Sequence, residues 1–336
     1  SLRPTSGIFE ITTCTYLASM ECSLDHKGYK KIDSLCKSDR TWKSAKVVDF
    51  LNLDPKDGRF SLYKLPLPSV HDTESIDPTF PVLDSRTKAF KATAKHLEGF
   101  VVIPGALDIE QQAFWCHECL STYNIRSSSV SNVKDLKDYP WDTLVSSGQI
   151  SKDLNDMRWL TLGYHFDWNN RQYHEDKRSP IPSNLSTLGR HIATAVECYD
   201  FKSEAAIVNF YRKKSRMGGH KDDLEPDQTA PVISISMGAD AIFLIGGESK
   251  ETEPVPILVR SGTILIMAGA SRRSVHGVSR IFPESYPPEL AKIIINLSLQ
   301  KRSGESNNGT SSAGPLEKDA AAGLRYLEGM RINVNI

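Results

Sequence analysis

The chain has 336 residues, of which 39% are hydrophobic and 24% are charged, so it is long enough for one large domain with an extension or for two domains. Its 41 basic residues balance 41 acidic ones, which excludes binding to nucleic acid through a global positive field and leaves only a local basic patch. No segment has about 18 consecutive apolar residues, so the sequence predicts no membrane span.

Residues 1–95 are polar, with Pro-rich turns and weak periodicity. One helix is predicted over Asp39–Leu51, because Trp42, Ala45 and Val48 recur at helical spacing. We expect this region to be an N-terminal extension that packs on the main domain or reaches around it.

Six cysteines are scattered along the chain, which fits a reducing compartment, and we expect an intracellular protein of the nucleus, cytoplasm or mitochondrion. Cys116 and Cys119 have the spacing of a redox or zinc motif, but they fall in one apolar helical segment without a second such pair. We therefore expect core thiols. The sequence opens on Ser1 without an initiator Met, so we expect a trimmed start and read no targeting signal from it.

The main unit is predicted over residues 96–336. It opens with a short strand within Leu97–Pro104, and Asp108 then caps a helix that runs to about Tyr123. A second helix is predicted over Ser183–Tyr199, where apolar residues form one stripe.

From residue 205 onward the chain changes to short runs rich in Val and Ile, separated by Gly, Asp or Pro. The predicted strands are Ala205–Tyr211, Val232–Met237, Ala241–Ile245, Pro256–Val259, Thr263–Met267, Val275–Arg280, Ile293–Leu299 and Arg331–Ile336. This pattern predicts an α+β fold whose core is a double-stranded β-helix, a cupin-like jelly roll, with flanking N-terminal helices. A low-complexity segment at about 302–318 predicts a flexible insert.

Two imidazoles and a carboxylate stand at the ends of predicted strands. His220 and Asp222 follow one strand through a glycine pair, and His276 follows several strands later. Such a facial triad holds non-haem Fe(II) on one side and leaves positions open for a co-substrate and O2. A second His-x-Asp, His174 and Asp176, lies in a polar stretch with no predicted strand, so nothing there is expected to fix its ligands.

A dicarboxylate co-substrate bound to the iron would also need a cation inside the barrel. Arginine suits that task, because its guanidinium stays charged and grips both carboxylate oxygens. Arg331 opens the last predicted strand, where alternation places Arg331, Asn333 and Asn335 on one face.

With His220, Asp222, His276 and Arg331 in this order, the chain resembles the AlkB family of Fe(II)/2-oxoglutarate dioxygenases. Asn209-Phe-Tyr211 resembles the family's Asn-x-Tyr strand, and Arg331-Ile-Asn333 matches the start of its closing Arg-x-Asn-x-Thr-x-Arg signature. The segment Trp159–Trp168 is similar to the eukaryotic homologue 1 group of that family.

Two departures from the family pattern matter. The signature's Thr is Asn335 here, and the sequence reaches Ile336 before the second Arg. Leu224 stands four residues after His220, where bacterial members carry an acidic base-recognising residue, so their alkyl-lesion specificity is not implied.

The resemblance implies that Fe(II) is held by His220, Asp222 and His276, and that 2-oxoglutarate and O2 are the co-substrates. The implied 2-oxoglutarate-binding residues are Asn209, Tyr211, Arg331, Asn333 and Asn335. The implied activity is oxidative demethylation of N-methylated adenine in nucleic acid (tRNA 1-methyladenine, DNA N6-methyladenine in unpaired or bulged DNA, or both), with release of formaldehyde, succinate and CO2 by a monomer. The alternatives are a protein or histone demethylase or hydroxylase, and a catalytically silent barrel that binds RNA.

A methyl group on a base edge is out of reach inside a duplex, so such an enzyme needs a flipped or unpaired nucleotide. Aromatic side chains must then replace the lost stacking, which is worth about 1–3 kcal/mol per base. Within a predicted nucleotide-recognition lid at about 159–182 and beside His276, the expected substrate contacts are Tyr164, His165, Trp168, Tyr173 and Arg272. The cations expected to meet the phosphates are Arg212, Lys213, Lys214, Arg216 and Arg273.

Overall fold

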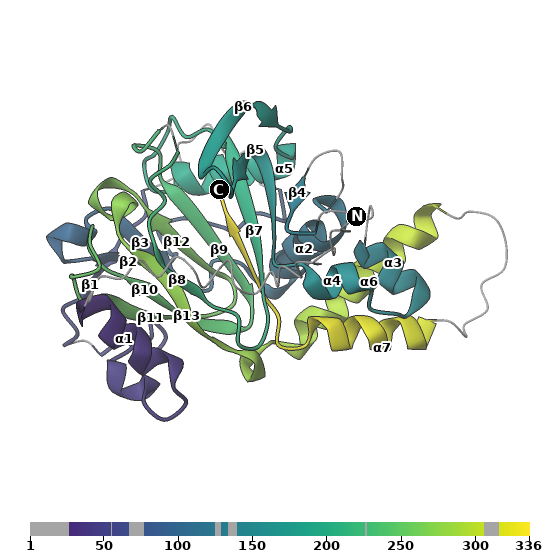
Figure 1. The fold of residues 1–336 in the computed structure, drawn as a ribbon, viewed down its shortest axis with the longest axis horizontal. Coiled ribbons are helices and arrows are strands. Elements are labelled where there is room, and N and C mark those ends of the chain that lie inside the picture. The colour runs from purple at the N-terminus through teal and green to yellow at the C-terminus, as the bar shows by residue number, and fades with distance from the viewer. Residues whose placement is uncertain are drawn as a thin grey trace, which may run out of the picture.

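The structure is a computed structural model that describes residues 27–54, 56–66, 77–124, 129–133, 140–225, 227–305 and 316–336 (Figure 1). Its larger sheet has ten antiparallel strands in the order β1-β2-β3-β12-β9-β14-β7-β5-β4, with β6 paired to β5. They are β1 (Phe60–Tyr63), β2 (Ala89–Ala92), β3 (Phe100–Ile103), β4 (Val130–Ser131), β5 (Trp159–Asp167), β6 (Gln172–Arg178), β7 (Ala205–Tyr211), β9 (Val232–Gly238), β12 (Thr263–Met267) and β14 (Arg331–Asn335).

The smaller sheet has four antiparallel strands in the order β11-β10-β13-β8. These are β8 (Met217–His220), β10 (Asp240–Ile245), β11 (Val255–Val259) and β13 (His276–Phe282). Side chains from both sheets share one buried cluster, which includes Leu265 and Met267 of β12 and Phe243 of β10. The two sheets therefore face each other, which confirms the predicted α+β fold with a jelly-roll core.

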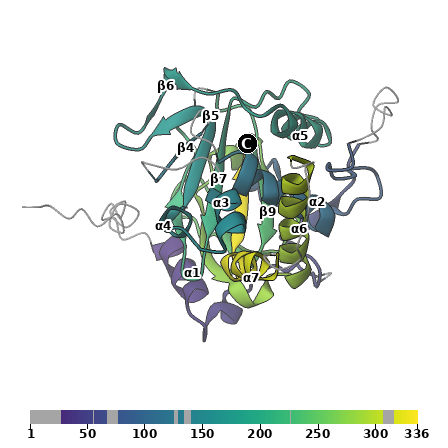
Figure 2. The ribbon, with the colours of Figure 1, turned by 90° about the vertical axis from the view of Figure 1, so that its right-hand side faces the viewer.

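Helices cover the other face of the larger sheet (Figure 2). Ile264 and Ile266 of β12 pack in a second cluster with residues of these helices, because successive side chains of a strand point to opposite faces. The helices of the molecule are α1 (Lys27–Lys37), α2 (Ile109–His117), α3 (Pro140–Ser147), α4 (Lys152–Asp156), α5 (Ser183–Thr194), α6 (Pro288–Glu305) and α7 (Leu316–Leu327). The short helical turns are η1 (Trp42–Ala45), η3 (Lys95–Leu97), η4 (Glu118–Thr122), η5 (Gly269–Arg273) and η6 (Pro283–Ser285).

The predicted helix over Asp39–Leu51 is wrong. Only η1 forms there, and Lys46 then takes a left-handed conformation with φ 54° before Val48 bridges to Ile257 of β11. The helix of this region is α1, whose side chains Tyr29, Ile32 and Cys36 are buried at helical spacing, a signal that the sequence did contain.

The predicted strand Ile293–Leu299 is also wrong, because these residues belong to helix α6. Its buried positions, Leu290, Ala291, Ile294, Ile295 and Ser298, recur with the period of a helix rather than alternating. A run of apolar, β-branched residues is ambiguous between a buried helix and a buried strand. The additional core strand is instead β8, which carries His220.

Other expectations hold. The seven remaining predicted strands are present within one or two residues of their predicted ends, and Asp108 caps α2 in a capping box with Gln111. Cys116 and Cys119 are buried free thiols, as expected. The helix predicted over Ser183–Tyr199 is present but shorter, and it ends at Thr194. The predicted insert falls largely on 306–315, outside the described residues. No helix in the described part of the chain is both long enough and apolar enough to cross a membrane.

Candidate metal centre and its surroundings

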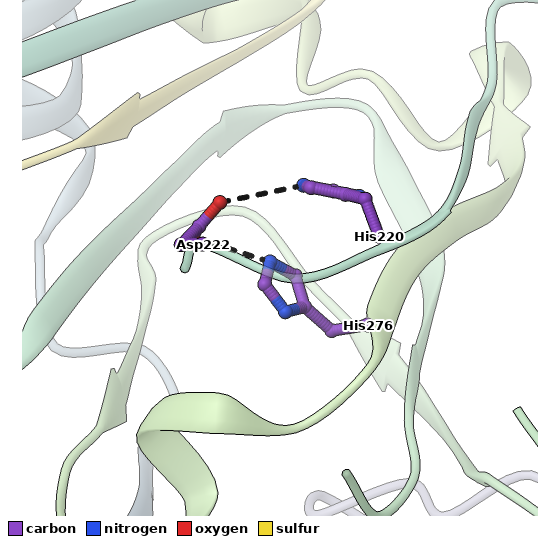
Figure 3. Close-up of side chains that lie close together, drawn as sticks. All are labelled: His220, Asp222 and His276. Atoms are coloured by element: carbon purple, nitrogen blue, oxygen red, sulfur yellow. Dashed lines mark ion pairs between the residues drawn. The ribbon is translucent and has the colours of Figure 1, made fainter. Parts of the chain in front are cut away.

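His220 and His276 lie directly opposite each other on the paired strands β8 and β13 (Figure 3). Opposed residues of an antiparallel pair point to the same face, and the two imidazole centroids are 4.4 Å apart. Asp222, two residues beyond the end of β8, places Oδ1 3.7 Å from Nε2 of His220 and Oδ2 3.4 Å from Nε2 of His276. The three ligand-type atoms lie within 4.8 Å of one another.

Backbone carbonyls fix the tautomer of both imidazoles. Nδ1 of His220 lies 2.9 Å from the carbonyl oxygen of Gly218, and Nδ1 of His276 lies 3.0 Å from that of Ser274. A carbonyl oxygen only accepts, so each Nδ1 donates, and each Nε2, which faces Asp222, is the nitrogen left to bind a metal ion. This is the arrangement of metal-binding histidines, whose second nitrogen is held by an outer partner.

The charges at this site are strongly coupled. Burial lowers the pKa of His220, and the neighbouring His276 lowers it further. Burial also works against protonation of His276, but the carboxylate of Asp222 outweighs it and raises the pKa of His276. For Asp222 burial alone would raise the pKa, yet the interactions with His276, His220 and Arg272 lower it well below its usual range. Two nitrogens and one ionised carboxylate, without a thiolate, form a donor set that suits Fe(II).

Among the described residues this triad is the only group of three such side chains close enough to hold a metal ion. The competing pair, His174 and Asp176, lies in strand β6, so the expectation that no strand flanks it is wrong. His174 is instead 3.5 Å from Asp167 in an ion pair.

Arg272, expected to contact substrate, lies against the metal-ligand segment. It is 2% exposed, and its guanidinium donates to the carbonyl oxygens of Asp222 and Ala230 and to Oε2 of Glu225 at 3.3 Å. Glu225 also accepts a hydrogen bond from the Tyr173 hydroxyl at 3.2 Å, so one carboxylate joins β6 to Arg272. Glu225 was not among the predicted site residues, and its only signal in the sequence is its place three residues after Asp222.

Replacing Arg272 with methionine is expected to weaken metal binding by about 10- to 100-fold, the usual effect of losing a side chain that orients a metal ligand. The reason is that Arg272 holds the Asp222 carbonyl in place. The neighbouring Arg273→Met is the control, because that side chain is exposed and its surface pair with Glu248 contributes little. Titration with Co(II) measures both affinities, and equal losses in the two variants would contradict a specific role for Arg272.

The predicted co-substrate residues lie on the inner face of β14 and β7. Arg331 is opposite Tyr211, and Asn333 is opposite Asn209. Asn333 uses its amide nitrogen on Ser234 and Ile235 of β9, at 2.9 and 3.0 Å. Asn335 lies farther along β14 and is partly exposed.

Arg331 is 2% exposed, and its guanidinium donates to Oγ of Ser236 at 2.7 Å and to the carbonyl oxygen of Ala239 at 3.2 Å. Its Nε has no partner, and in the described part of the chain no carboxylate forms an ion pair with it. Burial lowers the pKa of Arg331 to about 10. A buried cation with an unsatisfied N–H is costly unless an anion binds to it, so the site fits a ligand carboxylate.

Tyr211 is a buried phenol on β7, directly opposite Arg331 of β14. Burial raises its pKa to about 12, while Arg331 acts to lower it and Asp222 acts to raise it. The phenol therefore interacts with both the cation and the metal-ligand carboxylate. This arrangement fits a co-substrate that reaches from one to the other.

The predicted aromatic lid is the β5–β6 hairpin. Phe166 packs edge-on against Trp168 and Tyr173, with ring centroids 4.8 and 5.2 Å apart, and Trp168 remains 42% exposed. A cavity of about 300 Å³ beside the hairpin is lined by Tyr164, Tyr173 and Arg272, among others. The structure thus brings these three predicted substrate residues to one wall.

His165 and Trp168, the other two predicted substrate residues, do not line this cavity. His165 is instead bonded through Nδ1 to Oγ1 of Thr161 at 2.9 Å, within its own strand.

The predicted phosphate contacts divide into two groups. Lys213, Lys214 and Arg216 are exposed in the connection between β7 and β8, and Arg273 is exposed beside Glu248. Arg212 is different: its guanidinium stacks 4.2 Å from the ring centroid of Tyr326 and donates to the Tyr326 carbonyl. This packing holds the partly buried Arg212 guanidinium against Tyr326, and a phosphate contact for Arg212 stays a prediction.

The chain is similar to one family model and to several known proteins. The family model described as the 2OG-Fe(II) oxygenase superfamily matches residues 99–336. The mouse protein "Nucleic acid dioxygenase ALKBH1" is 32% identical over 253 residues, which cover 70% of this chain and 65% of the mouse protein. The Arabidopsis thaliana protein "DNA N(6)-methyladenine demethylase ALKBH1A" is 31% identical over 279 residues, covering 71% of this chain and 74% of that protein.

The Schizosaccharomyces pombe protein "tRNA demethylase abh1" is 40% identical over 133 residues, covering 39% of this chain and 44% of that protein. The matched part of this chain thus spans less than two thirds of the length of the mouse and fission yeast proteins.

Proposed function

Because the chain belongs to the 2OG-Fe(II) oxygenase superfamily, and within it to the AlkB family, we propose that it oxidatively demethylates N-methylated adenine in nucleic acid. The observation that carries the proposal is the meeting of His220, Asp222 and His276 at one point, with the unpaired buried cation of Arg331 on the facing sheet. An intact ligand set also argues against a silent RNA-binding barrel, which has no use for it.

Bound Fe(II), with 2-oxoglutarate and O2, supplies the oxidation of an N-methyl group, whose hydroxylated product releases formaldehyde. The residues of the chain position the reacting groups and exclude water from them. His220 and His276 would present Nε2 and Asp222 its carboxylate to the metal ion, and Arg331, which stands opposite Tyr211, would receive the distal carboxylate of the co-substrate. Phe243, with its ring centroid 5.8 Å from that of His276, keeps that side of the site apolar.

The names of the relatives support a nucleic-acid substrate. The mouse protein is named a nucleic acid dioxygenase, the Arabidopsis protein a DNA N(6)-methyladenine demethylase and the fission yeast protein a tRNA demethylase. In this chain the cavity beside the hairpin has Tyr164 and Tyr173 on its wall, and such rings stack on an unpaired base. The exposed cations Lys213, Lys214 and Arg216 precede strand β8 and supply charge for phosphates.

The test is an incubation of the protein with Fe(II) and 2-oxoglutarate on a matched series of substrates, with formaldehyde release and mass spectrometry of the bases as readouts. The series holds 1-methyladenine in a tRNA stem-loop, N6-methyladenine in single-stranded, bulged and fully paired DNA, the same oligonucleotides without methyl groups, and a methylated histone peptide. We expect turnover only on methylated, unpaired nucleic acid, because a paired base must first be flipped at a cost of a few kcal/mol. Equal turnover on the histone peptide would contradict the proposal and favour a protein demethylase.

A further inference from the structure

Helix α1 covers the outer face of the sheet that carries the histidines, and it precedes the span of the family match. Tyr29, Ile32 and Cys36 of α1 are buried in one cluster with Ile242 and Leu244 of β10. The opposite face of β10 points into the core between the sheets. The outer face of the smaller sheet is therefore covered by α1, together with Ala45 and Trp42 of η1.

Side-chain bonds fasten α1 along β13, the strand of His276. Oγ of Ser279 donates to the Asp33 carboxylate at 2.6 Å. Arg280 pairs with Asp39 just beyond the helix and donates to the carbonyl of Lys37 at 3.3 Å. α1 is thus fixed relative to the strand on which one metal ligand lies.

Two glycines flank the histidines, and Tyr29 covers both of them. Gly219 precedes His220, and a Cβ added there would lie 2.7 Å from Cε1 and 2.8 Å from Cζ of Tyr29. Gly277 follows His276, and a Cβ added there would lie 2.9 Å from the Tyr29 hydroxyl oxygen. Neither glycine has a positive φ. At Gly219 the absence of a side chain is therefore explained by the aromatic ring and not by backbone conformation.

The position of the Tyr29 ring is set by its own backbone. The Tyr29 N–H donates to the carbonyl of Lys250 at 3.0 Å. Gly28 lies so close to Glu251 that a Cβ there would be 2.2 Å from the Glu251 carbonyl oxygen. The start of α1 is therefore held against the turn that follows β10, and its ring has little room to move.

Strand β8 has little support of its own. It has four residues, it is the edge strand of the smaller sheet, and its pairing with β13 is irregular between His276 and Val278. A short edge strand is held by few backbone bonds and opens easily. Without another contact, the separation of His220 from His276 would vary.

We propose that Tyr29 is a positioning residue of the metal centre, whose side chain rests with its ring on β8 and with its hydroxyl on β13 and fixes the spacing of His220 and His276. The inference rests on the proposed function only in taking the triad as the metal site. The segment that precedes residue 99, where the family match begins, thereby contributes a residue that supports the metal centre.

The test compares Tyr29→Ala, Tyr29→Phe and Ile32→Ala by Co(II) titration, by the visible d–d spectrum of bound Co(II), and by Tm. We expect Tyr29→Ala to lose about 10-fold in Co(II) affinity and to alter the spectrum, as loss of an outer-shell contact does. Tyr29→Phe keeps the ring contact at Gly219 but loses the hydroxyl contact at Gly277, so it should lose less Co(II) affinity than Tyr29→Ala. Ile32→Ala removes packing of the same helix away from the glycines, so it should lower Tm and leave Co(II) affinity and spectrum unchanged.

A double-mutant cycle with Gly219→Ala tests the contact itself. Gly219→Ala alone should weaken Co(II) binding, because the new methyl group collides with the ring, whereas in the Tyr29→Ala background it should add nothing. Additive losses, or equal losses in Ile32→Ala and Tyr29→Ala, would overturn the positioning role. Normal Co(II) binding by Tyr29→Ala would do the same while leaving the proposed function intact, whereas a parent protein that binds no Co(II) would end both.

Discussion

The substitution His220→Ala is expected to abolish formaldehyde release and to weaken metal binding by more than about 100-fold, because even the loss of outer-shell partners costs 10- to 100-fold. The remaining His276 and Asp222 offer two ligands on two separate segments, and two ligands do not hold Fe(II) firmly at neutral pH. The fold should survive, since His220 lies at the end of a short edge strand and not in the core. Anaerobic Fe(II) or Co(II) titration and formaldehyde assay measure the two losses.

The chain supplies a matched control in its other His-x-Asp pair. His174→Ala removes an imidazole that pairs with Asp167 in the β5–β6 hairpin. It should leave metal affinity unchanged. If His174→Ala weakened metal binding as much as His220→Ala, the assignment of the triad would be wrong.

Replacing Arg331 with methionine should separate co-substrate binding from stability. We expect the dissociation constant for 2-oxoglutarate to rise between about 30- and 4000-fold, the equivalent of the 2–5 kcal/mol lost when one partner of a buried charge pair is removed. The apo protein should keep its stability within about 1 kcal/mol or gain some, because the variant no longer buries an unpaired cation. Titration of the Mn(II)-loaded protein with 2-oxoglutarate under nitrogen and denaturant unfolding measure the two quantities.

Arg260→Met is the control, for which we expect the opposite effects on stability and on 2-oxoglutarate affinity. Arg260 is paired with Asp49 at 2.8 Å and with Asp240 at 3.2 Å, and its side chain is 35% exposed. Its loss should lower stability by up to about 1 kcal/mol, as for a partly exposed ion pair, and leave 2-oxoglutarate affinity unchanged. A large loss of stability in Arg331→Met with normal 2-oxoglutarate binding would show that Arg331 is structural.

The strands of the core were predictable because their signal is local. β9 and β12 are runs of Val, Ile and other largely apolar residues next to Pro231 and Gly262, and each forms as predicted. The ligands of the metal site could also be predicted from the sequence, because two histidines and an aspartate at strand ends form a donor set for Fe(II).

Other predictions failed where a residue's partner lies far along the chain. Ile293–Leu299 had the composition of a strand, and only packing against α2 and α7 decided for helix α6. The structural contacts of Arg212 and Arg272 were likewise not predicted: one packs on Tyr326 and the other holds the Asp222 carbonyl. Composition does not distinguish a solvated arginine from one that supports a neighbouring segment.

By itself the amino-acid sequence determined which groups are available for catalysis and most strands of the core, because side-chain chemistry and strand periodicity reside in neighbouring residues. Only the tertiary structure decided that His220 and His276 stand opposite each other, that Arg331 is buried with no carboxylate partner among the described residues, and that Tyr29 lies on the glycines beside both histidines. The reason is physical: strand register, burial and ring contact depend on segments that meet only when the chain has folded.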